Sequence, residues 1–210
     1  MKEIIIGTQN PARVEQIKSA LVSVEVKLLT LSDLNREHVE VVEDGATPLE
    51  NARKKATTIA KTLGKPALAV DSALYFDVDN FPEEKQPGLE VRRIRERKDR
   101  PTDGELLEYF TALVREFADK KGQLKGHWDS AVCVATPEGK VFETTLLSPR
   151  IFVSKPCQQM TPGYPLESIQ IDPGSGKYIA EMTIEERAAF WQKTIGESLS
   201  RFIVEVLAKI

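Results

Sequence analysis

The segment from Thr47 to Ser72 carries the clearest structural signals in the sequence. Thr47-Pro48-Leu49-Glu50 is a capping box with proline at the first helical position, and the apolar stripe that follows it ends at Gly64. A short apolar run, Ala67–Val70, then leads directly into Asp71-Ser72. We therefore predict a helix followed by a buried strand, with the carboxylate of Asp71 at the end of that strand.

Strand and helix signals alternate along most of the chain, which is typical of a mixed α/β domain. Lys2–Gly7 predicts a strand, and Asn10-Pro11 predicts the start of a helix with asparagine as its cap. The other predicted elements are, in chain order, a strand at Val24–Leu29, a strand at Leu74–Val78, a helix from Thr102 to about Lys120, strands within Trp128–Val153 around a turn at Pro137-Glu138-Gly139, and a helical region that begins with the capping box Thr183–Glu186. We expect one domain, residues 1–210, with a long sheet.

The composition argues against several functional classes. With 210 residues, of which 41% are hydrophobic, the chain can bury a sizeable core without disulfides. Its net charge of -3 argues against bulk electrostatic binding to nucleic acid. Its apolar runs fall short of the roughly 18 residues that a membrane span needs, and the run after Met1-Lys2-Glu3 is too short for a signal peptide. We expect a cytoplasmic protein with no nucleic-acid or membrane partner.

The few cysteines and histidines restrict the chemistry further. Cys133 and Cys157 are far apart and form no CxxC spacing, and His38 and His127 are the only histidines. Zinc sites and histidine-based triads are therefore nearly excluded. The remaining candidate sites are four polar clusters located where strands end or helices begin, which is where open α/β sheets bind ligands.

The first cluster, Thr8 to Arg13, lies at a predicted helix N-terminus. The amide groups and the dipole of such a terminus suit a phosphate, and Arg13 lies one turn into the helix and is directed back toward that end. The cluster lacks the glycines and the Lys-Ser/Thr pair of a P-loop. The alternative interpretation is an ordinary asparagine cap followed by an exposed arginine.

The second cluster joins Glu43 to Asn51 and Lys55. The latter two residues are four apart and share one polar face of the predicted helix. The alternative is a solvated helix face on which Glu50 pairs with Lys54.

The third cluster is Asp71-Ser72, which follows a hydrophobic strand. Burial of a carboxylate costs free energy unless it meets a metal ion or a hydrogen-bond donor, so Asp71 is a candidate functional acid. The alternative is a carboxylate that caps a neighbouring turn.

The fourth cluster lies in a turn-rich segment and in the helical region that follows it. A tyrosine beside a glycine can stack on a base, and glutamine or lysine can read the edge of a base. Ordinary surface roles are the alternative for each member. The cluster comprises Gly163-Tyr164, Glu167, Lys177, Arg187, Gln192 and Lys193.

The order and spacing of these clusters resemble the inosine triphosphate pyrophosphatase family. That family hydrolyses non-canonical purine nucleoside triphosphates to the monophosphate and pyrophosphate. The matching segments are Thr8-x-Asn10-x-x-Arg13, Glu43-Asp44-Gly45-x-Thr47-x-x-Glu50-Asn51-Ala52-x-x-Lys55-Ala56, Ala69-Val70-Asp71-Ser72, Pro87-Gly88 with Arg93, Gly163 to Lys177, and Thr183 to Lys193.

The resemblance implies an ITPase-like (anticodon-like) α/β fold with a long mixed twisted sheet, flanking helices and two lobes around a central cleft. It also implies a homodimer and a requirement for Mg2+. The catalytic and metal-binding roles that it implies are Asp71 as the general base, Glu43 and Asp71 as metal ligands, and Arg13, Lys55 and Arg93 on the triphosphate. The remaining substrate-binding residues that it implies are Thr8, Asn10, Asn51 and Ser72, with Tyr164, Glu167, Arg187, Gln192 and Lys193 around the base.

The sequence departs from the family pattern at several of these positions. The family usually has an aspartate where this chain has Val70, and a lysine where it has Arg13. The family's Gly-Phe-Gly-Tyr-Asp segment is Gly163–Glu167 here, and its His-Arg pair is Gln192-Lys193. Most of the departures fall where the resemblance locates the nucleobase.

The leading hypothesis is therefore a Mg2+-dependent nucleoside triphosphate pyrophosphatase, acting on non-canonical purine nucleotides such as ITP, dITP or XTP with an altered base preference. The alternative is a catalytically weak nucleotide-binding or partner-binding protein on the same scaffold. A third interpretation takes the charge run Arg92–Arg100 as a nucleic-acid patch, which the acids Glu96 and Asp99 within it disfavour.

Overall fold

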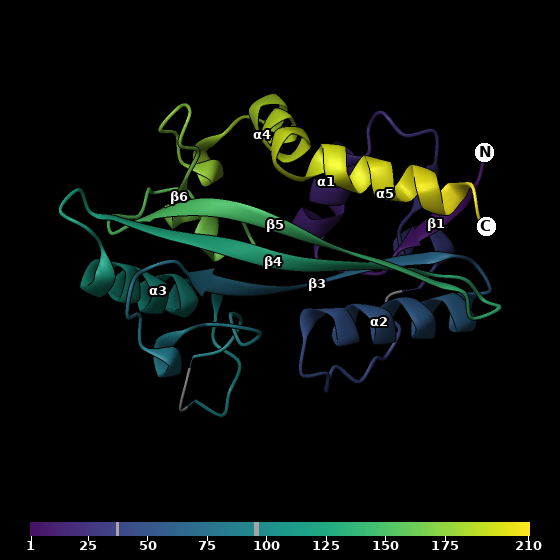
Figure 1. Ribbon diagram of the computed structural model, residues 1–210, viewed down its shortest axis with the longest axis horizontal. Helices are drawn as coiled ribbons and strands as arrows, with labels where there is room; N and C mark the ends of the chain where they lie inside the picture. Colours follow the sequence, from purple (N-terminus) through teal and green to yellow (C-terminus); the bar gives the residue numbers. More distant parts are fainter. Residues whose placement is uncertain (37, 95–96) are drawn as a thin grey trace. The chain divides into compact units, whose positions relative to one another are not determined.

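A computed structural model of the chain describes residues 1–36, 38–94 and 97–210, and Figure 1 shows its elements. The strands are β1 (Glu3–Ile6), β2 (Lys27–Leu29), β3 (Ala67–Phe76), β4 (Gln123–Ala135), β5 (Val141–Val153) and β6 (Gln170–Ile171). The α-helices are α1 (Pro11–Ala20), α2 (Pro48–Leu63), α3 (Asp103–Phe117), α4 (Ile184–Trp191) and α5 (Glu197–Leu207). A π-helical segment, Gln192–Gly196, joins α4 to α5.

In the described part of the chain the strands form one mixed sheet in the order β2-β1-β3-β4-β5-β6. Strand β1 pairs in parallel with β2 and with β3, where Ile5 lies opposite Leu29 and Ala67 respectively. Strand β5 pairs with β6 in the antiparallel direction. A mixed sheet with flanking helices confirms the predicted α/β class.

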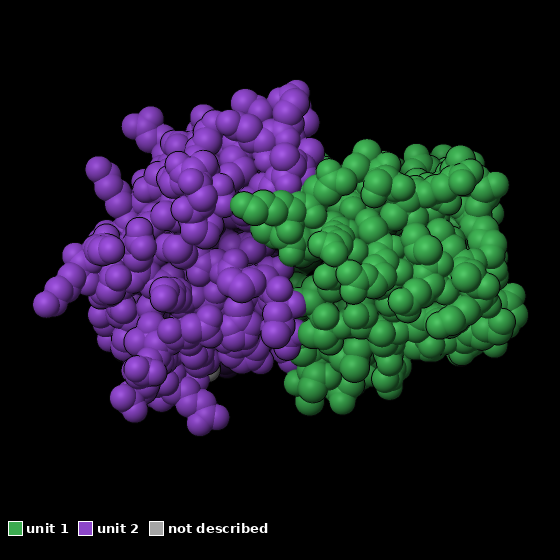
Figure 2. Space-filling model, turned by 45° about the horizontal axis from the view of Figure 1, so that its top comes forward, with its two compact units in different colours: residues 1–72, 130–146, 191–210 green, residues 73–129, 147–190 purple. Residues whose placement is uncertain are grey.

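The chain packs as two compact units (Figure 2). The first unit comprises residues 1–72, 130–146 and 191–210, and the second comprises residues 73–129 and 147–190. Strands β3, β4 and β5 each contribute residues to both units. The assignment of residues 1–210 to a single domain stays a prediction. Within the described residues, no helix combines the length and the apolar character needed to cross a membrane.

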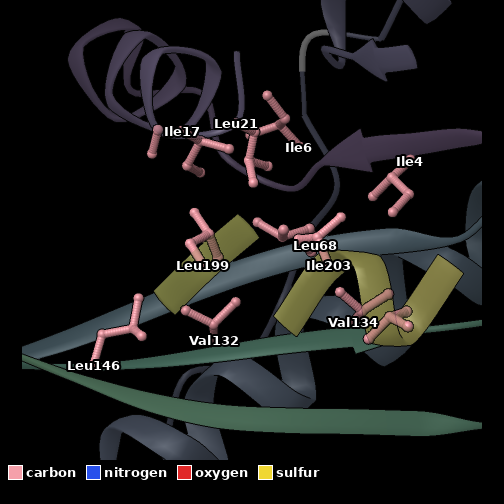
Figure 3. Close-up of a cluster of buried hydrophobic side chains, with 12 residues drawn as sticks. Ile4, Ile6, Ile17, Leu21, Leu68, Val132, Val134, Leu146, Leu199 and Ile203 are labelled. Carbon is pink, nitrogen blue, oxygen red and sulfur yellow. The ribbon is translucent and has the colours of Figure 1, made fainter. Parts of the chain in front are cut away.

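In the first unit, helices cover both faces of the sheet. On one face, Leu68 of β3 packs with Ile4 and Ile6 of β1 and with side chains of α1 and α5 (Figure 3). On the other face, Ala67 and Ala69 pack against α2. Side chains alternate along a strand, so the even-numbered residues of this part of β3 face α1 and α5 and the odd-numbered residues face α2.

The predicted helix ends of the first unit are confirmed. The Oδ1 atom of Asn10 accepts a hydrogen bond from the Ala12 amide at 3.1 Å, and the Oγ1 atom of Thr47 accepts one from the Glu50 amide at 3.2 Å. Gly64 ends α2 with a φ of 64°, a left-handed conformation that favours glycine. These caps satisfy backbone groups that a helix end leaves without an internal partner.

The second unit has its own core around α3. Leu106, Phe110 and Leu113 of α3 pack with Phe76 of β3 and Phe152 of β5. The helix ends at Phe117, before the predicted end near Lys120, because Ala118 takes an extended conformation.

The prediction of a strand that stops at Asp71-Ser72 is wrong. Ala67–Phe76 is one continuous strand, and Asp71 lies in its middle. The segment has no glycine or proline to break it, and Ala73 and Leu74 after the polar pair are fully buried. The polar pair is accommodated within the strand because both of its side chains have hydrogen-bond partners.

Two further predictions need correction. The strand predicted at Val24–Leu29 is limited to Lys27–Leu29, because the Val26 amide donates to the Val24 carbonyl at 2.8 Å in a local turn. In the capping box of α2, the carboxylate of Glu50 accepts a hydrogen bond from the Ala46 amide, at 2.7 Å, rather than from Thr47. The hydrogen bond thus fixes Ala46, the residue before the N-cap of α2, in addition to Thr47.

The capping box of α3 predicts a contribution to stability that is lost in acid. Glu105 pairs with Arg97 at 2.7 Å and accepts from the Thr102 amide at 2.8 Å, and these contacts lower the pKa of Glu105 from 4.5 to about 2. The contribution is complete above pH 4.5 and disappears as the pH falls toward 2.

We expect Glu105→Gln to be less stable at pH 7 and to lose less stability than wild type between pH 5 and 2. Urea unfolding across this range measures the effect, with Glu108→Gln, an exposed carboxylate of the same helix, as the control. A wild-type acid dependence in Glu105→Gln would contradict this assignment.

Candidate active site

Asp71 is held by two side chains of α2. The Nζ atom of Lys55 donates to its Oδ1 atom at 2.9 Å, and the Nδ2 atom of Asn51 donates to its Oδ2 atom at 3.2 Å. Both donors come from α2, where a spacing of four residues puts them on the same face. The side chain of Asp71 is only 16% exposed, so the two donors offset the cost of burying the carboxylate. Both carboxylate oxygens are thus fixed toward α2.

Glu43 lies on the other side of the same lysine. Its Oε2 atom is 2.7 Å from the Nζ atom of Lys55, and its side chain is 48% exposed. The loop before α2 is anchored by the Gly45 amide, which donates to the Oδ1 atom of Asn51 at 2.8 Å. A Cβ atom at Gly45 would lie 2.6 Å from that oxygen, so this position requires glycine. Asn51 therefore orients both Asp71 and the loop that carries Glu43.

Arg13 approaches β3 from the opposite face. Its Nη2 atom donates to the Oγ atom of Ser72 at 3.3 Å, and Ser72 Oγ lies 2.9 Å from Ser130 Oγ of β4. Asp71 and Ser72 are adjacent in the strand, so their side chains point to opposite faces of the sheet. Asp71 therefore bonds to Lys55 of α2, and Ser72 bonds to Arg13 of α1, at neighbouring positions of β3. Strand β1 ends at Ile6, and β3 continues beyond it to Phe76. Lys55 from one face and Arg13 from the other thus bond to adjacent residues of β3.

The N-terminus of α1 lies where β1 ends. The Asn10 side chain caps the helix through the Ala12 amide, and the Asn10 amide donates to Thr8 Oγ1 at 3.2 Å. The alternative interpretation of this segment as a cap is therefore correct as far as Asn10 is concerned. Arg13 is half-buried rather than exposed, because it bonds to Ser72 and to Gln16.

The alternative interpretation of the polar face of α2 is wrong in its pairing. Lys54 pairs with Asp44 of the preceding loop rather than with Glu50. Asp71 also bonds to side chains of α2 and does not cap a turn. The structure therefore brings together four of the residues that the sequence patterns single out, namely Glu43, Asn51, Lys55 and Asp71.

In the second unit, two of the predicted base-binding residues, Glu167 and Arg187, form an ion pair with little solvent exposure. Glu167 is 3% exposed and lies 3.3 Å from the Nη1 atom of Arg187. Arg150 of β5, which no sequence pattern indicated, is 5% exposed and lies over the ring of Phe190 at 5.1 Å. Burial lowers the pKa of Arg150 to about 10, although the charge of Glu167 acts in the opposite direction. Ser148, Arg150 and Phe152 alternate along β5 as buried residues, a pattern that becomes visible only in the structure.

A second pair missed by sequence reasoning holds the turn before Tyr164. Arg92 donates to the Gly163 carbonyl at 2.8 Å, and Asp103 accepts from the Gly163 amide at 2.6 Å. Arg92 and Asp103 are also paired with each other at 3.3 Å. The predicted phosphate ligand Arg93 is 75% exposed and lies 3.8 Å from Glu90. The arginine that holds the turn at Gly163 is therefore Arg92 and not its neighbour Arg93.

Three arginines of the charge run, Arg92, Arg93 and Arg97, are each paired with an acid. Arg97 bonds to Asp99 and to Glu105, while Arg95 and Glu96 lie outside the described residues. The described part of the run does not favour a nucleic-acid patch.

The predicted residues belong to both units. Thr8, Asn10, Arg13, Glu43, Asn51, Lys55, Asp71, Ser72, Gln192 and Lys193 lie in the first unit, and Arg93, Tyr164, Glu167 and Arg187 lie in the second. Gln192 and Lys193 are exposed in the π-helical segment between α4 and α5. Sequence patterns had not indicated this π-helical geometry.

The donor set of the first unit fits a hard divalent cation. Glu43 and Asp71 supply carboxylate oxygens on either side of one ammonium group. Among the described residues, no group of three or more histidine, cysteine, aspartate or glutamate side chains forms a complete metal site. Mg2+ is usually held by one or two carboxylates together with substrate phosphates and water, so two protein ligands are sufficient for it.

Comparison with known proteins gives consistent matches over most of the chain. A model of the Ham1 family matches residues 4–194. A dITP/XTP pyrophosphatase of Thermus thermophilus is 31% identical over 190 residues, covering 90% of this chain and 84% of that protein. A dITP/XTP pyrophosphatase of Escherichia coli O157:H7 is 28% identical over 194 residues, covering 90% and 91%. A HAM1 protein of Coxiella burnetii has the same fold, with a TM-score of 0.69 and 23% identity over 98% of this chain and 100% of that one.

The pair around Gly163 predicts a measurable cost when it is broken. Asp103→Ala removes the acceptor of the Gly163 amide and the partner of Arg92, and we expect a loss of about 1–3 kcal/mol in the free energy of unfolding. Urea denaturation measures it, with Glu108→Ala on the same helix as a control expected to change stability by about 0.5 kcal/mol or less. In the double variant Asp103→Ala/Arg92→Met, the loss of unfolding free energy should be smaller than the sum of the losses in the two single variants. The reason is that both substitutions remove the same Arg92–Asp103 contact. Full additivity would show that the two side chains act independently.

Proposed function

The chain belongs to the Ham1 family, and from this premise we propose that it hydrolyses a nucleoside triphosphate to the nucleoside monophosphate and pyrophosphate. The relatives named above are dITP/XTP pyrophosphatases. The observation that carries the proposal is the convergence of Asp71, Lys55 and Glu43, beside Ser72, which accepts a hydrogen bond from Arg13 in the first turn of α1. Acid, cation and helix terminus together are suited to phosphate chemistry.

Asp71 is the proposed general base. Each of its oxygens accepts one hydrogen bond, and a carboxylate oxygen retains a further lone pair that can take a proton from water. Asn51 and Lys55 hold the carboxylate in one orientation, so that it can direct a water molecule at the phosphorus of the first phosphate; the bond from this phosphorus to the oxygen that bridges to the second phosphate breaks, and pyrophosphate leaves. Lys55 and Arg13 are the proposed cations that offset charge on the leaving pyrophosphate.

Glu43 and Asp71 are the proposed ligands of Mg2+. A triphosphate carries roughly four negative charges, which two nearby carboxylates would repel. The metal ion would supply charge neutralisation and polarise the phosphoryl group. Glu43 is half-exposed, which leaves it accessible to an ion that arrives with its substrate.

The phosphate end of the substrate site is proposed to include Thr8, Asn10, Asn51 and Ser72, with Arg93 as a further cation. The base end is proposed to include Tyr164 as a stacking ring, Glu167 and Arg187 as hydrogen-bonding groups, and Gln192 and Lys193. Non-canonical purine nucleotides such as ITP, dITP and XTP are the proposed substrates, with a base preference that differs from the family's. The ionic character of the Glu167–Arg187 pair supports recognition of a polar base edge. A homodimer, as in the family that the sequence resembles, is part of the proposal.

A catalytically weak nucleotide-binding protein is the second candidate, and it is motivated by Val70. The side chain of Val70 packs against the apolar core on the α1 and α5 face, opposite to Asp71. The carboxylate that the family usually has at this position is therefore replaced by an apolar contact. This candidate predicts stabilisation by nucleotide without turnover.

The proposed reaction predicts a defined product and a defined dependence on Asp71. Wild-type protein with Mg2+ is expected to release pyrophosphate from at least one nucleoside triphosphate, and EDTA is expected to abolish the release. Asp71→Asn should lower kcat by about a hundredfold or more, because it removes the general base. Asp79→Asn, an exposed aspartate of the second unit, is the matched control. Release of orthophosphate, or full activity in Asp71→Asn, would defeat the assignment.

The base end predicts selectivity among nucleotides. A hydrogen bond lost to a buried base edge is worth about 1–3 kcal/mol, so we expect kcat/KM to differ by roughly 5- to 150-fold between bases. The measurement is a pyrophosphate-release panel over inosine, xanthosine, uridine, adenosine and guanosine triphosphates and their deoxy forms. Equal kcat/KM across the panel would contradict base recognition.

A further inference from the structure

Gln16 is a buried polar residue of α1 that no sequence pattern indicated. It is 7% exposed, although it lies on the surface helix that carries Arg13. A buried amide costs free energy unless it is hydrogen-bonded. The Oε1 atom of Gln16 accepts a hydrogen bond from the Nη1 atom of Arg13 at 3.0 Å, and the spacing of three residues puts both side chains on one helix face.

The other end of the same guanidinium is held from the sheet. The Nη2 atom of Arg13 donates to Ser72 Oγ at 3.3 Å, and Ser130 lies 2.9 Å from that oxygen. The planar fork of Arg13 is thus held at both of its terminal nitrogens, by α1 on one side and by β3 and β4 on the other. Arginine recognises phosphate through N–H groups that point in fixed directions within one plane. Because two of its nitrogens are held, the directions of all the N–H bonds of Arg13 are set.

The chemical nature of these holding groups differs from that around Lys55. Glu43 and Asp71, which hold Lys55, are carboxylates, whereas Gln16 and Ser72 accept hydrogen bonds from Arg13 through neutral oxygens and Ser130 bonds to Ser72. A neutral amide fixes the guanidinium without adding negative charge beside it. A glutamate at position 16 would make the same contact and would also attract the guanidinium away from an incoming anion.

We propose that Gln16 is a positioning residue that orients Arg13 toward the phosphate chain of the substrate while adding no charge of its own. Ser130 supports it by fixing Ser72. This inference rests on the proposed function in one respect, since it takes a polyphosphate as the ligand of Arg13.

The experiment measures binding of inorganic triphosphate to the full chain by calorimetry, without any turnover. Gln16→Met keeps the volume and removes the acceptor, and we expect binding about fivefold weaker than wild type. Gln16→Glu is expected to bind about tenfold more weakly or worse, because it adds a competing charge. The matched control is Gln158→Glu, the same chemical change at an exposed position of the second unit, which should leave the affinity unchanged. Thermal denaturation of each variant verifies that it is folded.

A structural role for Gln16 would lower affinity in any background, so the deciding comparison uses Arg13→Met. In that background Gln16→Met should cause no further loss, because Gln16 acts through Arg13. The same fivefold loss in both backgrounds would overturn the inference, as would an absence of triphosphate binding by the wild-type protein.

The pyrophosphate assay on the same variants separates this inference from the proposed function. If the wild-type protein binds triphosphate but releases no pyrophosphate, the proposed reaction fails while the binding comparison still decides the role of Gln16. If turnover is present, we expect Gln16→Met to raise KM about fivefold with a smaller change in kcat, since the contact orients a binding group. An unchanged KM in Gln16→Met would also overturn the inference.

Discussion

The alternation of side chains along β3 is the constraint on which the candidate site depends. Asp71 and Ser72 are consecutive, so one turns toward α2 and the other toward α1. A single strand thereby collects an acid held by a lysine on one face and an arginine held by serines on the other. Neither helix could bring both cations to this part of β3, because each covers only one face of the sheet. The apolar residues before Asp71 fix this orientation, since a shift by one residue would bury the acid among isoleucines.

The parts of the fold that depend on local chemistry were predictable from the sequence. Asn10, Thr47 and Gly64 are positioned by interactions within a few residues, and each ends or begins a helix as predicted. The continuity of β3 was not predictable in this way. Two adjacent polar residues ordinarily indicate the end of a buried strand, and only the donors from α1, α2 and β4 allow the strand to continue through them.

The same distinction applies to the candidate site. The spacing of Asn51 and Lys55 on one helix turn revealed their shared face, but it could not show that Lys55 pairs with Glu43 as well as Asp71. Gln16, Arg92 and Arg150 resemble ordinary surface residues in the sequence. Their burial or pairing arises from contacts with chain segments that are close only after folding, as between Arg92 and the peptide of Gly163. Roles that act through another side chain leave no pattern of their own.

The packing of Val70 bears on how related sequences should be compared. Val70 and Asp71 are adjacent, yet one lies in a hydrocarbon-like interior and the other meets ammonium and amide groups. A carboxylate restored at position 70 would have to leave that interior or distort the strand before it could join its neighbour. When this chain is compared with its relatives, positions 70 and 71 therefore have to be considered separately: the valine removes one acid from the strand, while the groups that hold Asp71 come from the opposite face of the sheet.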